Sequence, residues 1–209
     1  YNYTQIFQRE IKLTNSAPYV DVYGFTDPYE YQAAKIMPEM MRLVEKALQY
    51  GKRSTDTGNL TDTPRTMGGF EQFVTSNISS TTTVLSQSLI ESTLKMAYDK
   101  GASGDFIAII NPTDYQWVKS LYDSKDFIQF GPEQTRVGML PTQLVTAFGN
   151  VSFVLDRWQQ LHKIFFIKPE NLGFITLRPW TLVDIPATGD YTRKGLVGEF
   201  SFALKLEQS

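Results

Sequence analysis

The chain has 209 residues, of which 42% are hydrophobic, 13% aromatic and 20% charged, and its formal net charge is −2. This length and apolar content allow one large domain or two small ones with a real core. The near-neutral charge lacks the basic excess of a typical nucleic-acid-binding protein, and the absence of cysteine excludes disulfides and thiolate metal sites. Because charged residues fall below the roughly 25% of an ordinary domain, either the core is large or partners cover much of the surface.

The N-terminal segment is expected to be extended. Tyr1–Leu13 is rich in β-forming residues, partly alternates and contains no glycine or proline. It has neither the basic start nor the apolar run of a signal peptide. It begins like a strand already under way, so we expect further sequence upstream. Asn15–Pro18 breaks the run, and Tyr19–Tyr23 predicts a second short extended piece.

A long helix is predicted next. Asp27 is a good N-cap, Pro28 suits the first helical position, and Glu30 completes a capping box. Gly51 is a natural end. Pro38 in the interior should kink the helix or mark where its regular part begins. One apolar stripe is formed by Ile36, Met40, Leu43, Val44, Ala47 and Leu48.

A polar loop and a helix–strand–helix layer follow. Ser54–Pro64 is rich in threonine, aspartate and glycine and predicts a domain hinge. Gly68-Gly69 indicates a turn and not a phosphate loop, because no Gly-Lys-Ser/Thr ending follows it. Helices are expected near residues 84–100 and 111–121, with a short buried strand at 105–110 between them.

From Arg136 onward the sequence predicts strands and turns. Extended segments are expected near residues 140–148, 151–155, 163–167, 173–177, 180–185 and 196–206. In the last segment the even positions from Phe200 to Leu206 are apolar, which predicts a strand with one buried face. No run of about 18 apolar residues occurs, so the sequence predicts no membrane-spanning helix.

Residues able to carry chemistry are few. His162 is the single histidine, and no Gly-x-Ser-x-Gly turn accompanies it, so we expect it to be structural. Asp27 and Asp114 are better explained as helix-start residues. An acid/base pair among the other carboxylates stays open, although no spacing places two together. The basic and aromatic segments Arg178–Trp180 and Tyr191–Lys194 are more typical of ordinary surface than of a nucleic-acid platform. We expect no cofactor and no metal.

Short motifs occur in order along nearly the whole chain. Asn2–Phe7 is one, and Tyr23-Gly24-x-x-Asp27 and Glu45-x-x-Leu48-x-x-Gly51 bound the long helix. Gly101–Ile107 forms a helix-to-strand turn. The C-terminal motifs are Asp156-Arg157, Leu177-Arg178-Pro179, Thr188-Gly189-Asp190 and Glu199-Phe200-Ser201-Phe202. In this order they resemble the major capsid proteins of tailed bacteriophages (the Hong Kong 97 type).

The resemblance implies an α+β shell fold with an extended arm, a long spine helix, a peripheral domain and an axial domain. Residues 1–25 would form the arm, truncated at its N-terminal side. Residues 26–74 and 186–209 would form the peripheral domain, and 75–185 the axial domain. The tip of the axial domain would lie among Asp123–Pro141.

Contacts between subunits are expected on this basis. The arm would lie across a neighbouring subunit and bury Phe7 and Ile11 there, because a lone ribbon is marginal in water. Arg9 in the arm is a further expected contact, as are Arg178 and Trp180. Two more are expected in the axial tip, at Lys125 and Glu133.

The resemblance also implies a function and partners. The chain would assemble into pentamers and hexamers of an icosahedral shell around double-stranded DNA, which it would contact nonspecifically, with portal, scaffold and decoration proteins as further partners and no membrane. The expected location is the virion capsid, after assembly in the host cytoplasm. Three alternatives stay open: an encapsulin-like compartment holding a cargo enzyme, a small hydrolase using carboxylates, and a scaffold or decoration protein of related fold.

Overall fold

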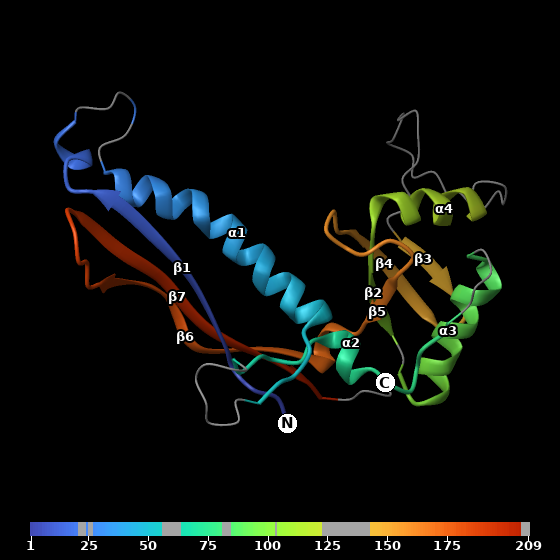
Figure 1. Cartoon of the computed structure of the whole chain (residues 1–209). Helices are drawn as coiled ribbons and strands as arrows, with labels where there is room; N and C mark the ends of the chain where they lie inside the picture. The colour runs from blue at the N-terminus through green and yellow to red at the C-terminus, as the bar shows by residue number, and fades with distance from the viewer. Residues whose placement is uncertain are drawn as a thin grey trace. The chain divides into compact units, whose positions relative to one another are not determined.

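Two separate β-sheets organise the chain, one of three strands and one of four (Figure 1). They belong to two units of the computed structural model, which describes residues 1–20, 24, 27–55, 64–80, 85–102, 104–122 and 143–205. The first unit contains Tyr1–Phe73 and Gly173–Leu204, and the second contains Val74–Leu172 and Lys205–Ser209. The mixture of helices and strands confirms the expected α+β class.

The three-stranded sheet of the first unit has the order β1-β7-β6. Its strands are β1 (Gln5–Thr14), β6 (Leu172–Ile185) and β7 (Tyr191–Leu204). β1 runs antiparallel to β7 over its whole length, from the pair Gln5↔Phe200 to the pair Thr14↔Tyr191. The sheet therefore joins the N-terminal end of the chain to the C-terminal end, and β6 lies at its edge.

The middle strand β7 is buried on both faces, so the prediction of a single buried face is wrong. Phe200 and Phe202 are buried as expected, but Glu199 and Ser201 between them are also only 4% and 6% exposed. Flanking strands cover both edges of β7, and side chains from other segments cover its second face. Leu206, which the sequence placed at the end of this strand, lies outside the described residues.

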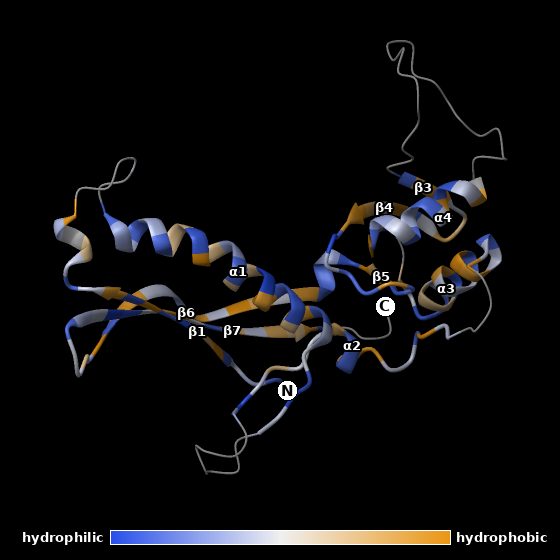
Figure 2. Cartoon of the chain, turned by 45° about the horizontal axis from the view of Figure 1, so that its top comes forward, coloured by the Kyte–Doolittle hydropathy of each residue, from blue (hydrophilic) through white to orange (hydrophobic). Residues whose placement is uncertain are grey.

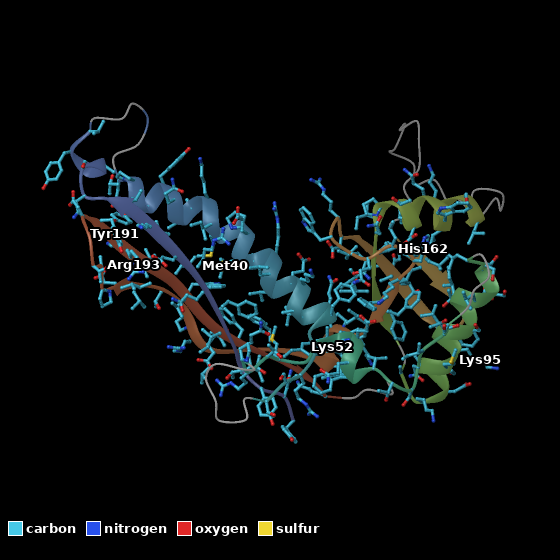
Figure 3. All side chains as sticks on the ribbon, in the orientation of Figure 1. Met40, Lys52, Lys95, His162, Tyr191 and Arg193 are labelled. Atoms are coloured by element: carbon cyan, nitrogen blue, oxygen red, sulfur yellow. The ribbon has the colours of Figure 1, made fainter. Side chains whose placement is uncertain are left out.

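Helix α1 (Pro28–Tyr50) lies against β1 and has the predicted N-terminus. The Asp27 side chain accepts a hydrogen bond from the Tyr29 N–H at 2.7 Å, and Pro28 opens the helix. Met40 (labelled in Figure 3) and Val44 are buried, but Leu43 remains 49% exposed, so the apolar stripe is narrower than predicted. The helix continues through Pro38 as one element.

The end of α1 packs against a glycine turn. The Gly69 N–H donates to the Gly51 carbonyl at 2.8 Å, just before the short helix α2 (Phe70–Phe73). A Cβ at Gly69 would lie 2.6 Å from the Ala47 carbonyl oxygen and 2.7 Å from the Gly51 nitrogen. Only a residue without a side chain allows this backbone approach, which is the structural reason for glycine at position 69. The preceding loop, predicted as a hinge, lies mostly outside the described residues, apart from the bridge Ser54↔Thr66.

The four-stranded sheet of the second unit has the order β3-β4-β2-β5. Its strands are β2 (Asp105–Ile110), β3 (Gln143–Thr146), β4 (Gly149–Leu155) and β5 (Ile164–Ile167). β2 pairs in parallel with β4 and antiparallel with β5, and β3 pairs antiparallel with β4. Hydrophobic residues dominate the middle of this sheet (Figure 2).

Two helices pack on one face of this sheet, α3 (Gln87–Asp99) and α4 (Pro112–Tyr122). They share a core with β2 and β4, made of Ile90, Leu94, Ala102, Phe106, Ala108, Ile110, Tyr115, Val118 and Val151. The predicted helix–strand–helix layer is confirmed, because α3, β2 and α4 follow one another in this core. Asn111, and not Asp114, caps α4, since the Asn111 side chain accepts the Thr113 N–H at 2.9 Å.

Several predicted boundaries differ from the observed ones. The two predicted strands at 173–177 and 180–185 form one strand, β6, because the chain stays extended through Pro179. This strand belongs to the first unit, so the unit boundary lies at residues 172 and 173 and not at 185. Tyr19, expected to start a short extended piece, instead ends a 3₁₀ helix (Ala17–Tyr19), and residues 21–23 of that piece lie outside the described residues. A second 3₁₀ helix spans Pro169–Asn171. No described helix is both long and apolar enough to cross a bilayer.

The glycine turn generates the first prediction. Gly69→Ala should lower the free energy of unfolding by about 1–3 kcal/mol, because the added methyl group meets backbone atoms that cannot move without opening the end of α1. Urea unfolding of the purified chain measures this change. Gly173→Ala is the control, because its Cβ would meet nothing closer than 3.5 Å. Its effect should stay within about 0.5 kcal/mol, and equal effects of the two substitutions would contradict the proposed packing.

Candidate assembly surfaces

A buried carboxylate on β7 joins three segments of the first unit. Glu199 accepts hydrogen bonds from Thr4 Oγ1 at 2.6 Å, Arg65 Nη2 at 2.9 Å and Arg178 Nε at 2.9 Å. Its donors come from the residues before β1, from the segment that precedes the glycine turn, and from β6. The carboxylate side chain is 5% exposed, whereas the Arg65 and Arg178 side chains are 45% and 55% exposed. The network therefore reaches from the buried middle strand to the surface.

These partners lower the pKa of Glu199 below its ordinary value of 4.5. The hydrogen bond from Thr4 is the largest cause, and the hydrogen bond and positive charge of Arg178 add to it, as does the charge of Arg65. Burial acts in the opposite direction and is outweighed. The carboxylate is therefore ionised at neutral pH, where charge-assisted hydrogen bonds are strongest.

The first residues of the chain are fixed to the same unit. The Asn2 side chain donates to the Gly68 and Phe202 carbonyls at 2.9 and 2.7 Å, and accepts from the Gly68 N–H at 2.7 Å. Ser201 Oγ donates to the Tyr3 carbonyl at 2.8 Å. The segment is thus bound to the turn after α1 and to β7 of its own chain.

The expectation that Phe7 and Ile11 become buried against a neighbour is wrong. Both are buried inside the first unit, at 6% and 3% exposure, because β1 pairs with β7 and lies beneath α1. The Phe7 ring lies 6.2 Å from the Phe200 ring. Described residues 1–20 therefore include a strand of the sheet and not a free arm. Arg9 on the same strand is 58% exposed and lies 3.9 Å from Glu39 of α1.

The remaining predicted contact residues divide between β6 and the undescribed tip. Arg178 and Trp180 are both on β6, where Trp180 packs 5.0 Å from the Phe200 ring and over Gly198. Lys125 and Glu133, with the rest of the predicted axial tip, lie outside the described residues.

β6 carries an exposed apolar surface that the sequence interpretation missed. Five large side chains are 46–60% exposed although they occupy both faces of the strand: Phe174, Ile175, Leu177, Leu182 and Val183. Long apolar edge strands are avoided in soluble monomers, because they offer free backbone groups and hydrophobic side chains to other chains. The available signal was an apolar segment of 14 residues that contains only two charged ones, Arg178 and Asp184.

Other exposed apolar side chains lie on helices, on turns and on further strands. On α1 they are Tyr31, Met41 and Leu43, at 39–49% exposure. In the second unit they include Trp117, Leu155, Trp158 and Leu161, at 51–57% exposure, and Val145 of β3 at 75%. Both units therefore present apolar side chains to solvent.

Charged and aromatic groups meet where β6 turns into β7. The Lys12 ammonium lies 3.8 Å from the centre of the Tyr191 ring, and Arg193 lies beside the same ring (Figure 3). The hydrogen bond from Thr188, with the positive charges of Lys12 and Arg193, lowers the pKa of Tyr191. Arg193 also pairs with Glu10 at 3.4 Å. These contacts fix the turn to β1.

His162 lies in a turn that Asp114 stabilises. Its backbone N–H donates to Asp114 Oδ2 at 2.7 Å, which holds the residue at a φ of 63°. Its ring nitrogen Nδ1 lies 3.5 Å from Asp114 Oδ1, and the side chain is 85% exposed. Asp114, in the first turn of α4, thus supports the turn that contains His162. Among the described residues, no group of three or more metal-ligating side chains could hold a metal ion.

Comparison with models of protein families identifies the family of this chain. The family model of the SU10 major capsid protein matches residues 1–209. The chain belongs to the SU10 major capsid protein family. This is a family of structural proteins, and membership confirms the resemblance to capsid proteins that the ordered motifs carry. A search of the curated proteins finds no match to this chain.

Solved structures show the same fold at low sequence identity. A chain of Mycobacterium phage Adephagia has a TM-score of 0.60 and 10% identity, covering 98% of this chain and 66% of its own. The capsid of an empty GTA particle has a TM-score of 0.62 and 12% identity, covering 98% of this chain and 70% of its own. The SrpI encapsulin of Synechococcus elongatus PCC 7942 has a TM-score of 0.62 and 7% identity, covering 98% and 71%.

The chain therefore spans about two thirds of the length of these proteins. The fold alone is shared by phage capsids and an encapsulin, but the family match favours the capsid assignment over the encapsulin alternative.

The Glu199 network generates the second prediction. Glu199→Gln should lower the free energy of unfolding at neutral pH by about 2 kcal/mol, because charge-assisted bonds to two arginines become neutral ones. In the unsubstituted chain the lowered pKa contributes stability above the ordinary value of 4.5, and this is lost as the pH falls through the folded-state pKa. The substituted chain should therefore lose less stability on acidification. Thermal unfolding between about pH 7 and pH 3 measures both effects.

Glu170→Gln is the matched control. This carboxylate is 81% exposed and pairs only loosely with Lys168, at 3.8 Å. Removing its charge should change stability by less than about 0.5 kcal/mol. Glu199 would not have the role described here if both substitutions gave the same acid dependence.

Proposed function

We propose that this chain is the shell subunit of a tailed-phage head, and that it assembles with copies of itself into pentamers and hexamers of an icosahedral capsid. The observation that carries the proposal is the match of the whole chain to a major capsid protein family. The fold shared with a phage chain and a GTA capsid supports it. The protein would act through the geometry of its contacts and not through catalysis, and its place would be the virion capsid.

The exposed surfaces support an assembling subunit. Apolar side chains remain exposed on β6, on α1 and in the second unit, so each unit has surface to bury against neighbours. Closed rings need heterologous contacts, in which two different surfaces of the same subunit meet. The first unit, with the long helix and the three-stranded sheet, would be the peripheral domain. The second would be the axial domain, whose tip we place at residues 123–141.

Partners of the shell follow from the same proposal. With a net charge of −2 the protein would contact packaged double-stranded DNA weakly and without sequence preference, so the genome could move freely as it enters. Portal, scaffold and decoration proteins are further proposed partners, and assembly would take place in the host cytoplasm. The alternative is an encapsulin-like compartment, because the SrpI encapsulin has the same fold.

The third prediction concerns particle formation. The concentrated chain, expressed with any sequence that naturally precedes Tyr1, should form rings or closed shells, because the exposed apolar surfaces are buried only by association. Negative-stain electron microscopy and sedimentation detect them. A protein that stays monomeric at every concentration would contradict the proposal.

The fourth prediction separates a phage shell from a cargo compartment. Mature particles isolated from infected cells should contain nuclease-protected double-stranded DNA and no stoichiometric enzyme. Nuclease digestion followed by extraction measures the DNA, and mass spectrometry of the washed particles identifies proteins. A cargo enzyme without protected DNA would instead support the encapsulin alternative.

A further inference from the structure

The outer edge of β6 carries a pattern that fits a second copy of itself. The strand is the last in the order β1-β7-β6, so one side of its backbone has no partner strand among the described residues. Thr181 lies in its interior and is exposed. Arg178 stands three residues before Thr181 and Asp184 three residues after it. The two charged residues of the strand are therefore opposite in sign and equally distant from one threonine.

Antiparallel pairing of two such strands about Thr181 places opposite charges together and apolar side chains together. In this register Thr181 faces Thr181 of the other copy, and Arg178 faces Asp184 twice, once in each direction. Trp180 faces Leu182, and Leu177 faces Ile185, so apolar side chains also meet apolar ones. Directly opposite residues in antiparallel strands share a face, so opposite charges and apolar pairs stabilise this arrangement. Shifting the register by one residue destroys the pairing of charges.

The geometry points to a two-fold contact in which β6 of one subunit pairs edge to edge with β6 of another, centred on Thr181. The contact would continue the three-stranded sheet of each subunit into a six-stranded sheet across the pair. It is isologous, because the same surface is used by both copies. The inference rests on the proposed function, since it assigns one of the contacts by which shell subunits would associate.

Two residues of the strand set the strength of this contact. The Arg178 Nε bond to Glu199 holds the guanidinium at the strand while 55% of its side chain remains exposed to reach Asp184 of the other copy. Pro179 lacks an N–H group, so the ladder loses at most one backbone bond per copy. Proline commonly protects an edge strand from unwanted pairing, because it cannot donate a backbone hydrogen bond. Pairing of β6 would therefore depend on matching side chains of the two copies as well as on backbone bonds.

A single cysteine tests the register, because the chain contains none. In the proposed pair the two Thr181 Cα atoms lie about 4.5–5.5 Å apart, within the range of a disulfide. Thr181→Cys should therefore give a disulfide-linked dimer under mild oxidation, seen on a non-reducing gel. Thr176→Cys is the matched control, exposed on the same strand. Its two copies would lie roughly 34 Å apart and should not cross-link.

The charge pairing is tested in the same background. Adding Asp184→Arg to Thr181→Cys should reduce the cross-linked dimer roughly tenfold, because two attractive pairs become repulsive ones. Adding Asp99→Arg, an exposed change of the same charge in the second unit, should leave the dimer unchanged.

Imaging the same preparations separates the inference from the proposed function. Particles without a Thr181→Cys dimer, or with equal dimer from Thr176→Cys, would overturn the β6 contact and leave the shell function standing. A specific dimer without particles would support the contact and contradict the shell function. Neither dimer nor particles would overturn both.

Discussion

The first unit depends on a middle strand that is buried on both faces and carries an ionised carboxylate. β7 pairs with β1 on one side and β6 on the other, so the two ends of the described chain are held in one sheet. Glu199 on that strand is buried, and it is stabilised because Thr4, Arg65 and Arg178 all donate to it. Removing one donor would leave a buried charge less compensated, which is far more destabilising than losing an exposed ion pair.

This arrangement explains where the free surface lies. The N-terminal segment is held against β7 by the bond from Thr4 to Glu199 and by the bond from Asn2 to the Phe202 carbonyl. Helix α1 packs against β1. β6 has no such cover, and its apolar residues remain exposed on both faces. The unit can thus be stable by itself and still present a hydrophobic edge to another chain. A shell subunit needs both properties, because it must fold before it assembles and must bury surface when it does.

The sequence predicted local secondary structure better than it predicted which strands pair. Asp27 and Pro28 define the start of α1 because capping is a local interaction, and the helix–strand–helix layer follows from local periodicity. The burial of Phe7 within its own unit could not be predicted, because its partner strand lies about 190 residues away in sequence, at Gly198. The burial of Glu199 depends on arginines from two distant segments. The exposed surface of β6 was missed for a similar reason, because the apolar composition of the segment is visible in the sequence but its position at the sheet edge depends on strand pairing.

Backbone hydrogen exchange of free and assembled chains tests the central claim that β7 is stable before assembly and that β6 is completed by it. Amides of β7 should be strongly protected in both states, because they are paired on both sides within one chain. Amides on the outer edge of β6 should exchange fast in the free chain and become protected on assembly. The account would be contradicted if β7 exchanged as fast as β6 in the free chain, since the sheet would then form only when subunits associate.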